Sequence, residues 1–420
     1  MKIVILNHIN VLNLGDASVI YATVDLINNY LNPDEISILS FNPNYDVKYL
    51  ELPSNVQVLP SPAREAPSIR QKIEVISDMF IFLVWALFLR IGIDISCVFS
   101  RNRQKVAEVL RGADLVIIRG SDTLTDIYGI RSITLNLFNI FLSLFIRRKT
   151  VALSHSIGPF KTRIWRILAA KLLRKIDCFA VRDKYSRELL EEMGIPSSKV
   201  HLLPDIAFML PPKKTRLPQL MEMNPQQLHV GLIPSALVWR FLAQDEKETR
   251  YVSYISLFSR IIDYLVETYK ASVILIPHVL YWRADDRKTA QDIYKNVRNK
   301  EKTYIYYDYN PRKVKYVISR LDFLISPRMH PIVHALSTGV PVIGIDYNMK
   351  IKELMKSFAL EEFVIDINEL DFEKLKSKID KVVLELDSLR NRVIKAKNSM
   401  NMKLKGYRTL LIKLLCRDNK

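Results

Sequence analysis

One stretch of the chain carries side chains that could bind and protonate an anionic small molecule. It begins with the run from Ser326 to His330 and ends with the run from Asp346 to Lys350. A guanidinium offers a fork of donors that fits phosphate or carboxylate, whereas an ammonium acts as a mobile point charge. Histidine can give and accept protons near neutral pH. We therefore expect Arg328, His330 and Lys350 at a site for a phosphorylated, carboxylated molecule.

Two strands and a short helix would position these residues. We predict strands from Phe323 to Ser326 and from Pro341 to Asp346, with a helix from 331 to 338 between them. In open parallel sheets, ligands bind at the carboxyl ends of strands, where loops lead into helix N-termini. The cationic stretch has that position.

The same alternation of strand and helix runs along most of the chain. The other predicted strands are Lys2 to Asn7, Ile36 to Phe41, Asp114 to Arg119, Thr150 to His155, Cys178 to Arg182, Leu228 to Pro234 and Ala271 to Pro277. Helices are predicted over 17–31, over 251–269 and over most of the chain from 366 onward. This alternation is typical of α/β proteins with parallel sheets. It predicts two Rossmann-like lobes facing each other across a cleft.

Length favours more than one domain, because 420 residues exceed the roughly 250–300 at which a single core stops growing. Proline and basic residues between Leu210 and Pro218 suggest a linker. We expect an N-terminal lobe over 1–212, a second lobe over 219–390 and a basic C-terminal helix over 391–420. We expect this helix to pack back on the first lobe, and binding to anionic lipid is the alternative.

Composition limits the partners and the location. Lys plus Arg exceeds Asp plus Glu by 62 − 44 = 18, which favours anionic partners. Aromatic residues are not interleaved with the basic ones, so we do not expect nucleic acid as a partner. The three cysteines are far apart, which argues against a disulfide framework or a zinc site and favours a reducing compartment. The first apolar run is too short for a secretory signal, so we expect a cytoplasmic protein.

Two strongly apolar segments, 79–89 and 132–146, are shorter than the roughly 20 residues of a spanning helix. We expect core helices there. The alternative is peripheral docking on the inner face of the membrane, with an anionic membrane surface as a partner.

A second loop, with Gly15 and Asp16 as candidate substrate-binding residues, follows the first predicted strand. Gly15 permits a close approach or a positive φ in the turn, and Asp16 could cap the helix that follows. No G-x-G-x-x-G or Walker sequence accompanies this glycine, which disfavours NAD and ATP chemistry. We expect no cofactor and no metal site.

The ordered motifs of the chain resemble those of the polysaccharide pyruvyl transferases, a family with the two-lobed fold of B-type glycosyltransferases. The matching motifs are Asn13-Leu14-Gly15-Asp16, Ser154-His155-Ser156-Ile157-Gly158-Pro159-Phe160, Ala180-Val181-Arg182-Asp183-Lys184-Tyr185-Ser186, Pro204-Asp205-Ile206-Ala207-Phe208 and the segment from Arg328 to Lys350. The chain departs from the family pattern at His155, where glutamine is usual, and at Pro331, where alanine is usual.

The resemblance implies transfer of the pyruvyl group of phosphoenolpyruvate onto two hydroxyls of a sugar, giving a cyclic ketal. It makes the first lobe the acceptor side, for a polysaccharide or lipid-linked glycan, and the second lobe the phosphoenolpyruvate side. His330 is then the expected general acid or base. Arg328 and Lys350 would hold the phosphate and carboxylate, with Arg182 reaching in from the other lobe. His155 and His278 are expected near the substrates, His155 on the acceptor sugar.

Each of these residues also has a structural interpretation. Arg328 and Lys350 could be exposed solubilising charges, His330 could cap a helix starting at Pro331, and His278 could only shape a loop. Arg182 could pair with Asp183 at the surface, and Asp205 could order the hinge.

Two other functions remain open at this stage. One is a nucleotide-sugar glycosyltransferase on the same scaffold, with Glu361 and Glu362 holding a ribose. The other is a non-catalytic glycan-binding protein.

Overall fold

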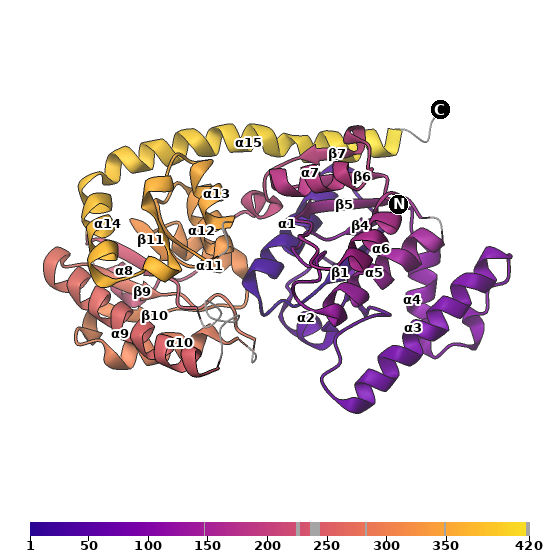
Figure 1. Cartoon of the computed structure of the whole chain (residues 1–420), viewed down its shortest axis with the longest axis horizontal. Coiled ribbons are helices and arrows are strands. Elements are labelled where there is room, and N and C mark those ends of the chain that lie inside the picture. Colours follow the sequence, from indigo (N-terminus) through magenta and orange to yellow (C-terminus); the bar gives the residue numbers. More distant parts are fainter. Residues whose placement is uncertain (147, 224–226, 236–243, 282–283, 348–349, 417–420) are drawn as a thin grey trace. The chain divides into compact units, whose positions relative to one another are not determined.

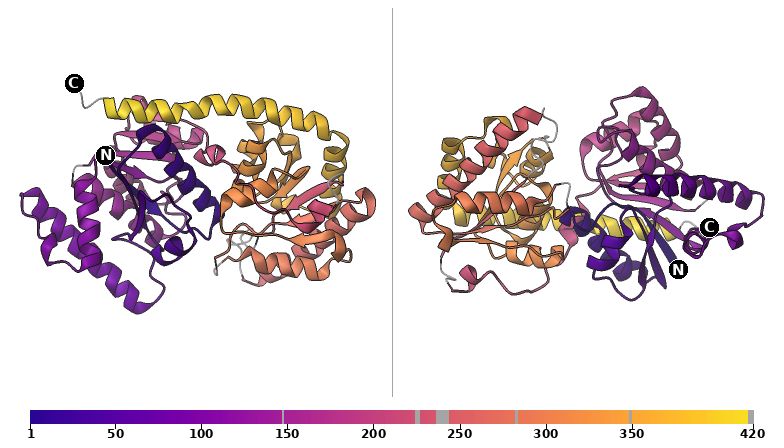
Figure 2. Two further views of the ribbon diagram at one scale, coloured as in Figure 1. Left: turned by 180° about the vertical axis from the view of Figure 1, so that it is seen from behind. Right: turned by 90° about the horizontal axis from the view of Figure 1, so that it is seen from below.

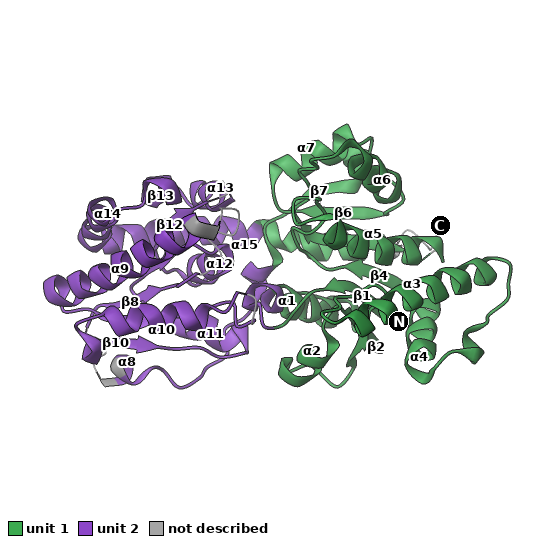
Figure 3. Ribbon diagram, turned by 60° about the horizontal axis from the view of Figure 1, so that its bottom comes forward, with its two compact units in different colours: residues 1–11, 19–206, 403–420 green, residues 12–18, 207–402 purple. Residues whose placement is uncertain are grey.

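The computed structural model describes residues 1–146, 148–223, 227–235, 244–281, 284–347 and 350–416. The chain forms two compact units, coloured separately in Figure 3. Unit 1 consists of residues 1–11, 19–206 and 403–420, and unit 2 consists of residues 12–18 and 207–402. Each unit contains one sheet.

Unit 1 is built on a seven-stranded parallel sheet in the order β3-β2-β1-β4-β5-β6-β7. Its strands are β1 (Lys2–His8), β2 (Glu35–Ser40), β3 (Val56–Pro60), β4 (Leu115–Ile118), β5 (Thr150–His155), β6 (Cys178–Val181) and β7 (Val200–Leu202). Its helices are α2 (Pro43–Tyr49), α3 (Ile69–Arg90), α4 (Arg101–Gly112), α5 (Ile130–Phe145), α6 (Arg163–Leu173), α7 (Lys184–Glu192) and most of α1 (Leu14–Leu31). Figures 1 and 2 show these helices around the sheet.

Unit 2 is built on a six-stranded parallel sheet in the order β10-β9-β8-β11-β12-β13. Its strands are β8 (His229–Leu232), β9 (Ser272–Leu275), β10 (Thr303–Ile305), β11 (Phe323–Ser326), β12 (Val342–Asp346) and β13 (Val364–Asp366). Its helices are α8 (Gln219–Met223), α9 (Gln244–Tyr269), α10 (Asp286–Asn296), α11 (Pro311–Ile318), α12 (Met329–Thr338), α13 (Lys350–Lys356), α14 (Phe372–Leu384) and most of α15 (Leu386–Cys416).

The central strands have apolar side chains on both faces because helices cover both faces of each sheet. All four residues of β4 and all four of β11 are buried. Two parallel sheets with flanking helices confirm the expected α/β class with two Rossmann-like lobes. The short outer strands β3, β7, β10 and β13 were not among the predicted ones.

The unit boundaries differ in detail from the expected lobe boundaries. The chain passes from unit 1 to unit 2 at Ile206, before the proline-rich segment, and residues 12–18 belong to unit 2. The C-terminal helix begins at Leu386 and not near 391, and only its part from Lys403 belongs to unit 1. Within unit 1 this part packs on the segment after β7, where the Tyr407 hydroxyl donates to the Pro204 carbonyl at 2.8 Å.

The two apolar segments have different environments. Helix α5 contains all but the last residue of the segment 132–146 and is largely buried against the sheet of unit 1. Helix α3 contains the segment 79–89 and buries only one side. No helix in the described part of the chain is both long enough and apolar enough to cross a membrane.

Candidate active site

Arg328 is the buried cation of the predicted stretch. It follows β11 and stands at the N-cap position of α12. Only 9% of the residue is exposed, and its Nη2 donates to Oδ1 of Asp286 at 2.6 Å. The interpretation of Arg328 as an exposed solubilising charge is therefore wrong.

Asp286 holds this arginine and also fixes a neighbouring loop. It is the first residue of α10, and it is fully buried. Its Oδ2 accepts backbone N–H bonds from His278 at 3.2 Å and from Val279 at 2.8 Å, just after β9. One carboxylate thus joins the loops that follow β9 and β11. We did not predict Asp286, although Asp285 and Asp286 ahead of a polar helix are a recognisable N-terminal signal.

His330 lies in the first turn of α12. The helix begins at Met329, so the expectation that His330 caps a helix starting at Pro331 is wrong. Its ring packs on Gly15, where a Cβ atom would lie 2.4 Å from Nδ1 of His330. Only glycine permits that approach.

The segment around Gly15 reaches His330 because residues 12–18 are part of unit 2. The Leu14 N–H donates to the His278 carbonyl at 3.1 Å, and the Leu280 N–H donates to the Leu12 carbonyl at 2.7 Å. These bonds join two parts of the chain that lie more than 260 residues apart in sequence. Two loops that we predicted separately, the Gly15 turn and the His278 loop, therefore meet at one place.

Asp16 does not cap the helix. Helix α1 begins at Leu14, which puts Asp16 in its first turn. Asn13 stands before the helix, and its Oδ1 accepts the Gly15 N–H at 3.2 Å while its Nδ2 donates to Oδ2 of Asp16 at 2.8 Å. Asp16 thus helps to orient the Asn13 side chain, which in turn accepts the Gly15 N–H.

Two further imidazoles are buried beside this group. Burial, together with the nearby His330 and Arg328, holds the pKa of His278 well below its ordinary value. The ring of His278 meets that of His334 at 5.5 Å between centroids. His334, whose pKa is also well below its usual value because of burial and Lys315, shares a 2.9 Å hydrogen bond with Oγ of Ser18. Both rings are neutral near pH 7, and we did not predict His334.

Lys350 is the first residue of α13, after β12. Two residues of the predicted stretch, 348 and 349, lie outside the described part of the chain. His278, Arg328 and Lys350 follow β9, β11 and β12 respectively. The predicted unit 2 residues therefore share the carboxyl edge of one parallel sheet, where ligands bind in open α/β folds.

The predicted unit 1 residues have a different environment. Arg182 pairs with Asp205 at 2.6 Å, both nearly inaccessible, and Nε of Arg182 donates to Oγ of Ser156 at 2.9 Å. Asp183 instead caps α7 by accepting the Ser186 N–H, so the Arg182–Asp183 surface pair is wrong. Although burial lowers the pKa of Arg182, Asp205 raises it further, which secures its charge.

His155 ends β5 in the interior of unit 1, where it is 1% exposed. One ring nitrogen lies 3.3 Å from the Ile118 carbonyl. Burial and the charges of Arg119 and Arg182 lower the pKa of His155 to about 3. Its contact with an acceptor sugar stays a prediction, and the buried position favours a structural role.

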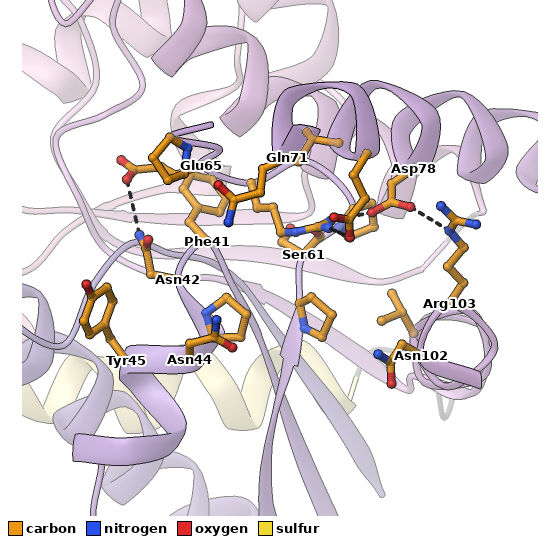
Figure 4. A pocket seen from close by; sticks show the side chains of 18 of the residues that line it. Phe41, Asn42, Asn44, Tyr45, Ser61, Glu65, Gln71, Asp78, Asn102 and Arg103 are labelled. Carbon is orange, nitrogen blue, oxygen red and sulfur yellow. Dashed lines mark hydrogen bonds and ion pairs between the residues drawn. The ribbon is translucent and has the colours of Figure 1, made fainter. Parts of the chain in front are cut away.

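Unit 1 also contains a cavity of about 890 Å³ beside the ends of β2 and β3 (Figure 4). Three cations and three carboxylates line it: Lys48, Arg64, Arg103, Glu65, Glu74 and Asp78. Asp78 accepts from Arg64 at 2.5 Å and from Arg103 at 2.6 Å. The rest of the lining includes amides and aromatic rings, among them Asn44 and Tyr45 on α2. With its charges balanced, this pocket suits a neutral polar molecule better than an anion.

A buried carboxylate anchors α2 beside this pocket. Asp46 is fully buried, lies 3.2 Å from Nε2 of His8 and accepts from the Ser40 hydroxyl and from the Val11 N–H. Burial raises the pKa of Asp46, but His8 and these donors outweigh burial and lower it. The carboxylate therefore holds the helix that carries Asn44 and Tyr45.

Among the described residues, no group of three or more His, Cys, Asp or Glu side chains is placed to hold a metal ion. The unit 2 site instead combines a paired buried guanidinium with three imidazoles. Such a set can bind an anion and move protons.

Comparison with known proteins identifies the family. Residues 13–349 match the model of the polysaccharide pyruvyl transferases. The chain belongs to this family. Amylovoran biosynthesis protein AmsJ from Erwinia amylovora is 23% identical to this pyruvyl transferase family member over 298 residues, covering 70% of this chain and 71% of AmsJ.

Solved structures share the fold of this family member. UDP-GlcNAc 2-epimerase from Neisseria meningitidis, bound to UDP-GlcNAc, matches with a TM-score of 0.58 and 12% identity over 99% of this chain and 100% of that chain. Anabaena HepE in complex with UDP matches with a TM-score of 0.57 and 11% identity over 99% and 100%. These similarities show the glycosyltransferase-B-like fold. The family places the chain among transferases that act on polysaccharide.

Proposed function

We propose that this protein transfers the pyruvyl group of phosphoenolpyruvate to two hydroxyls of a cell-surface polysaccharide or lipid-linked glycan, giving a pyruvate ketal. The main support is the buried Arg328–Asp286 pair beside His330 at the carboxyl edge of the unit 2 sheet. Family membership agrees with this reaction.

The reaction asks for one anion-binding group and one group that moves protons. Protonation of C3 of the enol by His330 makes C2 an oxocarbenium-like centre, which a sugar hydroxyl attacks as it loses its proton. Cleavage of the C2–O bond then releases phosphate, and a second hydroxyl closes the ketal with loss of its own proton. Arg328 binds phosphate or carboxylate, and Lys350 adds a second cation.

The two buried neutral imidazoles suit this scheme. Because the pKa values of His278 and His334 are depressed, they add no charge near pH 7 that would resist protonation of His330. His278 also fixes Leu14 through its carbonyl and thereby supports Gly15 under the His330 ring.

We assign the acceptor glycan to unit 1. The pocket beside α2 offers amides and the partly exposed ring of Tyr45, groups that suit hydroxyls and the apolar faces of sugar rings. Its paired charges leave little net attraction for phosphoenolpyruvate. Donor and acceptor would then be recognised by different units.

The structural neighbours bind UDP or UDP-GlcNAc, which favours a nucleotide-sugar glycosyltransferase as the second candidate. One of its two expected ribose ligands is engaged elsewhere, because the Glu362 carboxylate pairs with Lys381 and, at 2.9 Å, with Arg392. Turnover of a nucleotide sugar, with none of phosphoenolpyruvate, would support this candidate.

The direct test is release of inorganic phosphate from phosphoenolpyruvate with a panel of glycan acceptors. His330→Ala should slow release by at least about 100-fold, the usual size of a general acid–base contribution. Arg328→Ala would remove the guanidinium that offsets the charge of the buried Asp286, at a cost of about 3–5 kcal/mol in stability. Arg328→Lys keeps a positive charge at this position but removes the forked donors of the guanidinium. We expect this variant to slow phosphate release by about 100-fold.

The matched control is Arg320→Ala, which removes an exposed arginine of unit 2 that stacks on Tyr316. It should release phosphate at the wild-type rate. Thermal unfolding of every variant separates loss of chemistry from loss of fold. Wild-type rates in His330→Ala or in Arg328→Lys would exclude the proposed roles.

A further inference from the structure

Helix α3 presents a long apolar stripe on its outer side. Six large residues make up the stripe: Ile69, Ile73, Ile76, Phe80, Leu87 and Ile91, the last at the C-cap. All six are exposed, from 50% for Leu87 to 76% for Ile69. With about 3.6 residues per turn, they fall within roughly a quarter of the helix circumference. They therefore form one continuous surface.

The opposite side of the same helix is already used by unit 1. Val75, Phe82 and Trp85 are buried there, and the Phe82 and Trp85 rings meet edge to face at 5.9 Å. A helix that is apolar on both sides is typical of an element covered on both sides. Within the described chain only the inner side of α3 is covered.

The stripe continues into the loop after the helix. Ile93 and Val98 are also exposed, at 48% and 78%. Asp94 fixes this loop by accepting from Nε1 of Trp85 at 3.0 Å and by pairing with Arg111. Figures 1 and 2 show that α3 and this loop form the outermost part of unit 1.

Charges around the stripe are basic. Arg70, Lys72 and Arg90 are exposed on the helix, and Arg101 follows the loop. Of the carboxylates in α3, Asp78 is buried and Glu74 pairs with Arg64 at 2.7 Å. The whole chain carries a formal charge of +18. Apolar side chains flanked by unneutralised cations are what an interfacial helix presents to anionic lipid.

We propose that α3 and the loop after it dock this protein on an anionic lipid bilayer. The helix would lie in the plane of the interface, with the stripe among the acyl chains and Arg70, Lys72 and Arg90 at the headgroups. A twofold dimer through the same stripe is disfavoured, because an isologous contact sets like surfaces against each other and brings these cations together. Docking does not depend on the proposed reaction.

The test is cosedimentation of the full chain with vesicles of phosphatidylcholine alone and of an equal mixture of phosphatidylcholine and phosphatidylglycerol. Wild type should bind the mixed vesicles more strongly than the neutral ones, and high salt should weaken the binding. Ile76→Glu with Phe80→Glu should weaken partition by about tenfold or more, because two apolar side chains are lost from the interface. Arg70→Glu with Lys72→Glu should reduce only the preference for the anionic vesicles.

The matched controls change equally exposed apolar residues elsewhere: Ile164→Glu on α6, 69% exposed, and Leu384→Glu on α14, 85% exposed. Both should bind vesicles as wild type does. All these side chains are exposed, so every variant should melt at the wild-type temperature.

Three results would overturn the proposal: no binding of wild type to either vesicle, undiminished binding of the stripe variant, or equal loss in the controls. Analytical ultracentrifugation tests the alternative that a second copy of the chain binds the stripe. Suppose that wild type forms a dimer but does not bind vesicles, and that the double variant Ile76→Glu with Phe80→Glu is a monomer. The stripe would then be the contact surface for a second copy of the chain.

Discussion

At the scale of single residues, the position of His330 depends on an atom that Gly15 lacks. A Cβ there would lie 2.4 Å from Nδ1 and 2.8 Å from Cγ of the imidazole. If the His330 ring moved away to make room for a Cβ at position 15, its position relative to Arg328, two residues earlier, would change. The glycine is therefore as important for placing the imidazole as the helix that carries it.

Gly15→Ala should displace the His330 ring. We expect phosphate release to fall by about 100-fold, since a shift of about 1 Å in a catalytic group can have that effect. Overpacking should also lower the unfolding free energy by about 1–3 kcal/mol. Gly112→Ala is the matched control, because its Cβ would meet only the Lys2 side chain, at 3.9 Å. Wild-type turnover in Gly15→Ala would contradict the close packing of these two residues.

At the scale of elements, helix α11 brings an unusual cation into unit 2. Lys315 is 1% exposed, and its Nζ lies 3.5 Å and 3.4 Å from the carbonyls of Ala207 and Phe208, in the first residues after unit 1. Burial, assisted by the charge of Lys397, lowers the pKa of Lys315 to about 7. The side chain of Lys315 joins this segment to α11 by donating to both carbonyls.

This depressed pKa gives a pH dependence of defined sign. Between about pH 7 and pH 10 the unfolded chain binds a proton that the folded chain has lost, so the free energy of unfolding rises with pH over that range. Lys315→Met removes this term. The stability difference, variant minus wild type, should therefore be larger at pH 6 than at pH 9 by about 3 kcal/mol, measured by urea unfolding.

The control for this effect is Lys295→Met on α10, whose side chain is 73% exposed. Its stability difference from wild type should stay constant from pH 6 to pH 9. A constant difference for Lys315→Met as well would show that the buried lysine keeps its ordinary pKa.

Sequence predicted the central elements better than the outer ones. The strands β5 and β11 have the predicted bounds, since each contains an apolar run, 151–153 in β5 and 323–325 in β11, that polar residues follow. The missed strands β3, β7, β10 and β13 have only 3 to 5 residues and lie toward the sheet edges, where partial exposure weakens the apolar pattern. The apolar segments in α3 and α5 look alike in sequence. Their composition does not show that unit 1 covers α5 but leaves one side of α3 exposed.

The candidate site was predictable residue by residue but not as an arrangement. Arg328, His330 and Gly15 follow from residue type and from their positions after strands. The carboxylate that holds Arg328 could not be assigned, because Asp286 reaches it from a separate loop 42 residues away. His334 was missed because a buried histidine within an apolar helix gives no sequence signal that separates it from a core residue.

At the scale of the whole molecule, the two units differ in the charges around their candidate sites. Arg328, Lys350 and three imidazoles gather at one edge of the unit 2 sheet. The unit 1 pocket balances Lys48, Arg64 and Arg103 with three carboxylates. The unit 2 edge offers a guanidinium, an ammonium and imidazoles as donors to an anionic substrate, whereas a balanced polar pocket suits a neutral molecule.

This difference predicts that the two substrates can be weakened separately. Tyr45→Ala and Asn44→Ala should each raise the KM for the glycan by about tenfold, because each removes about 1–2 kcal/mol of contact with the acceptor. The KM for phosphoenolpyruvate should not change. Tyr30→Ala, which removes a 42% exposed residue from the part of α1 that belongs to the same unit, should leave both constants unchanged. Equal increases in both KM values would contradict separate recognition.

If wild type turns over phosphoenolpyruvate and neither pocket variant alters the acceptor KM, the reaction would stand and the assignment of the acceptor to the unit 1 pocket would be wrong.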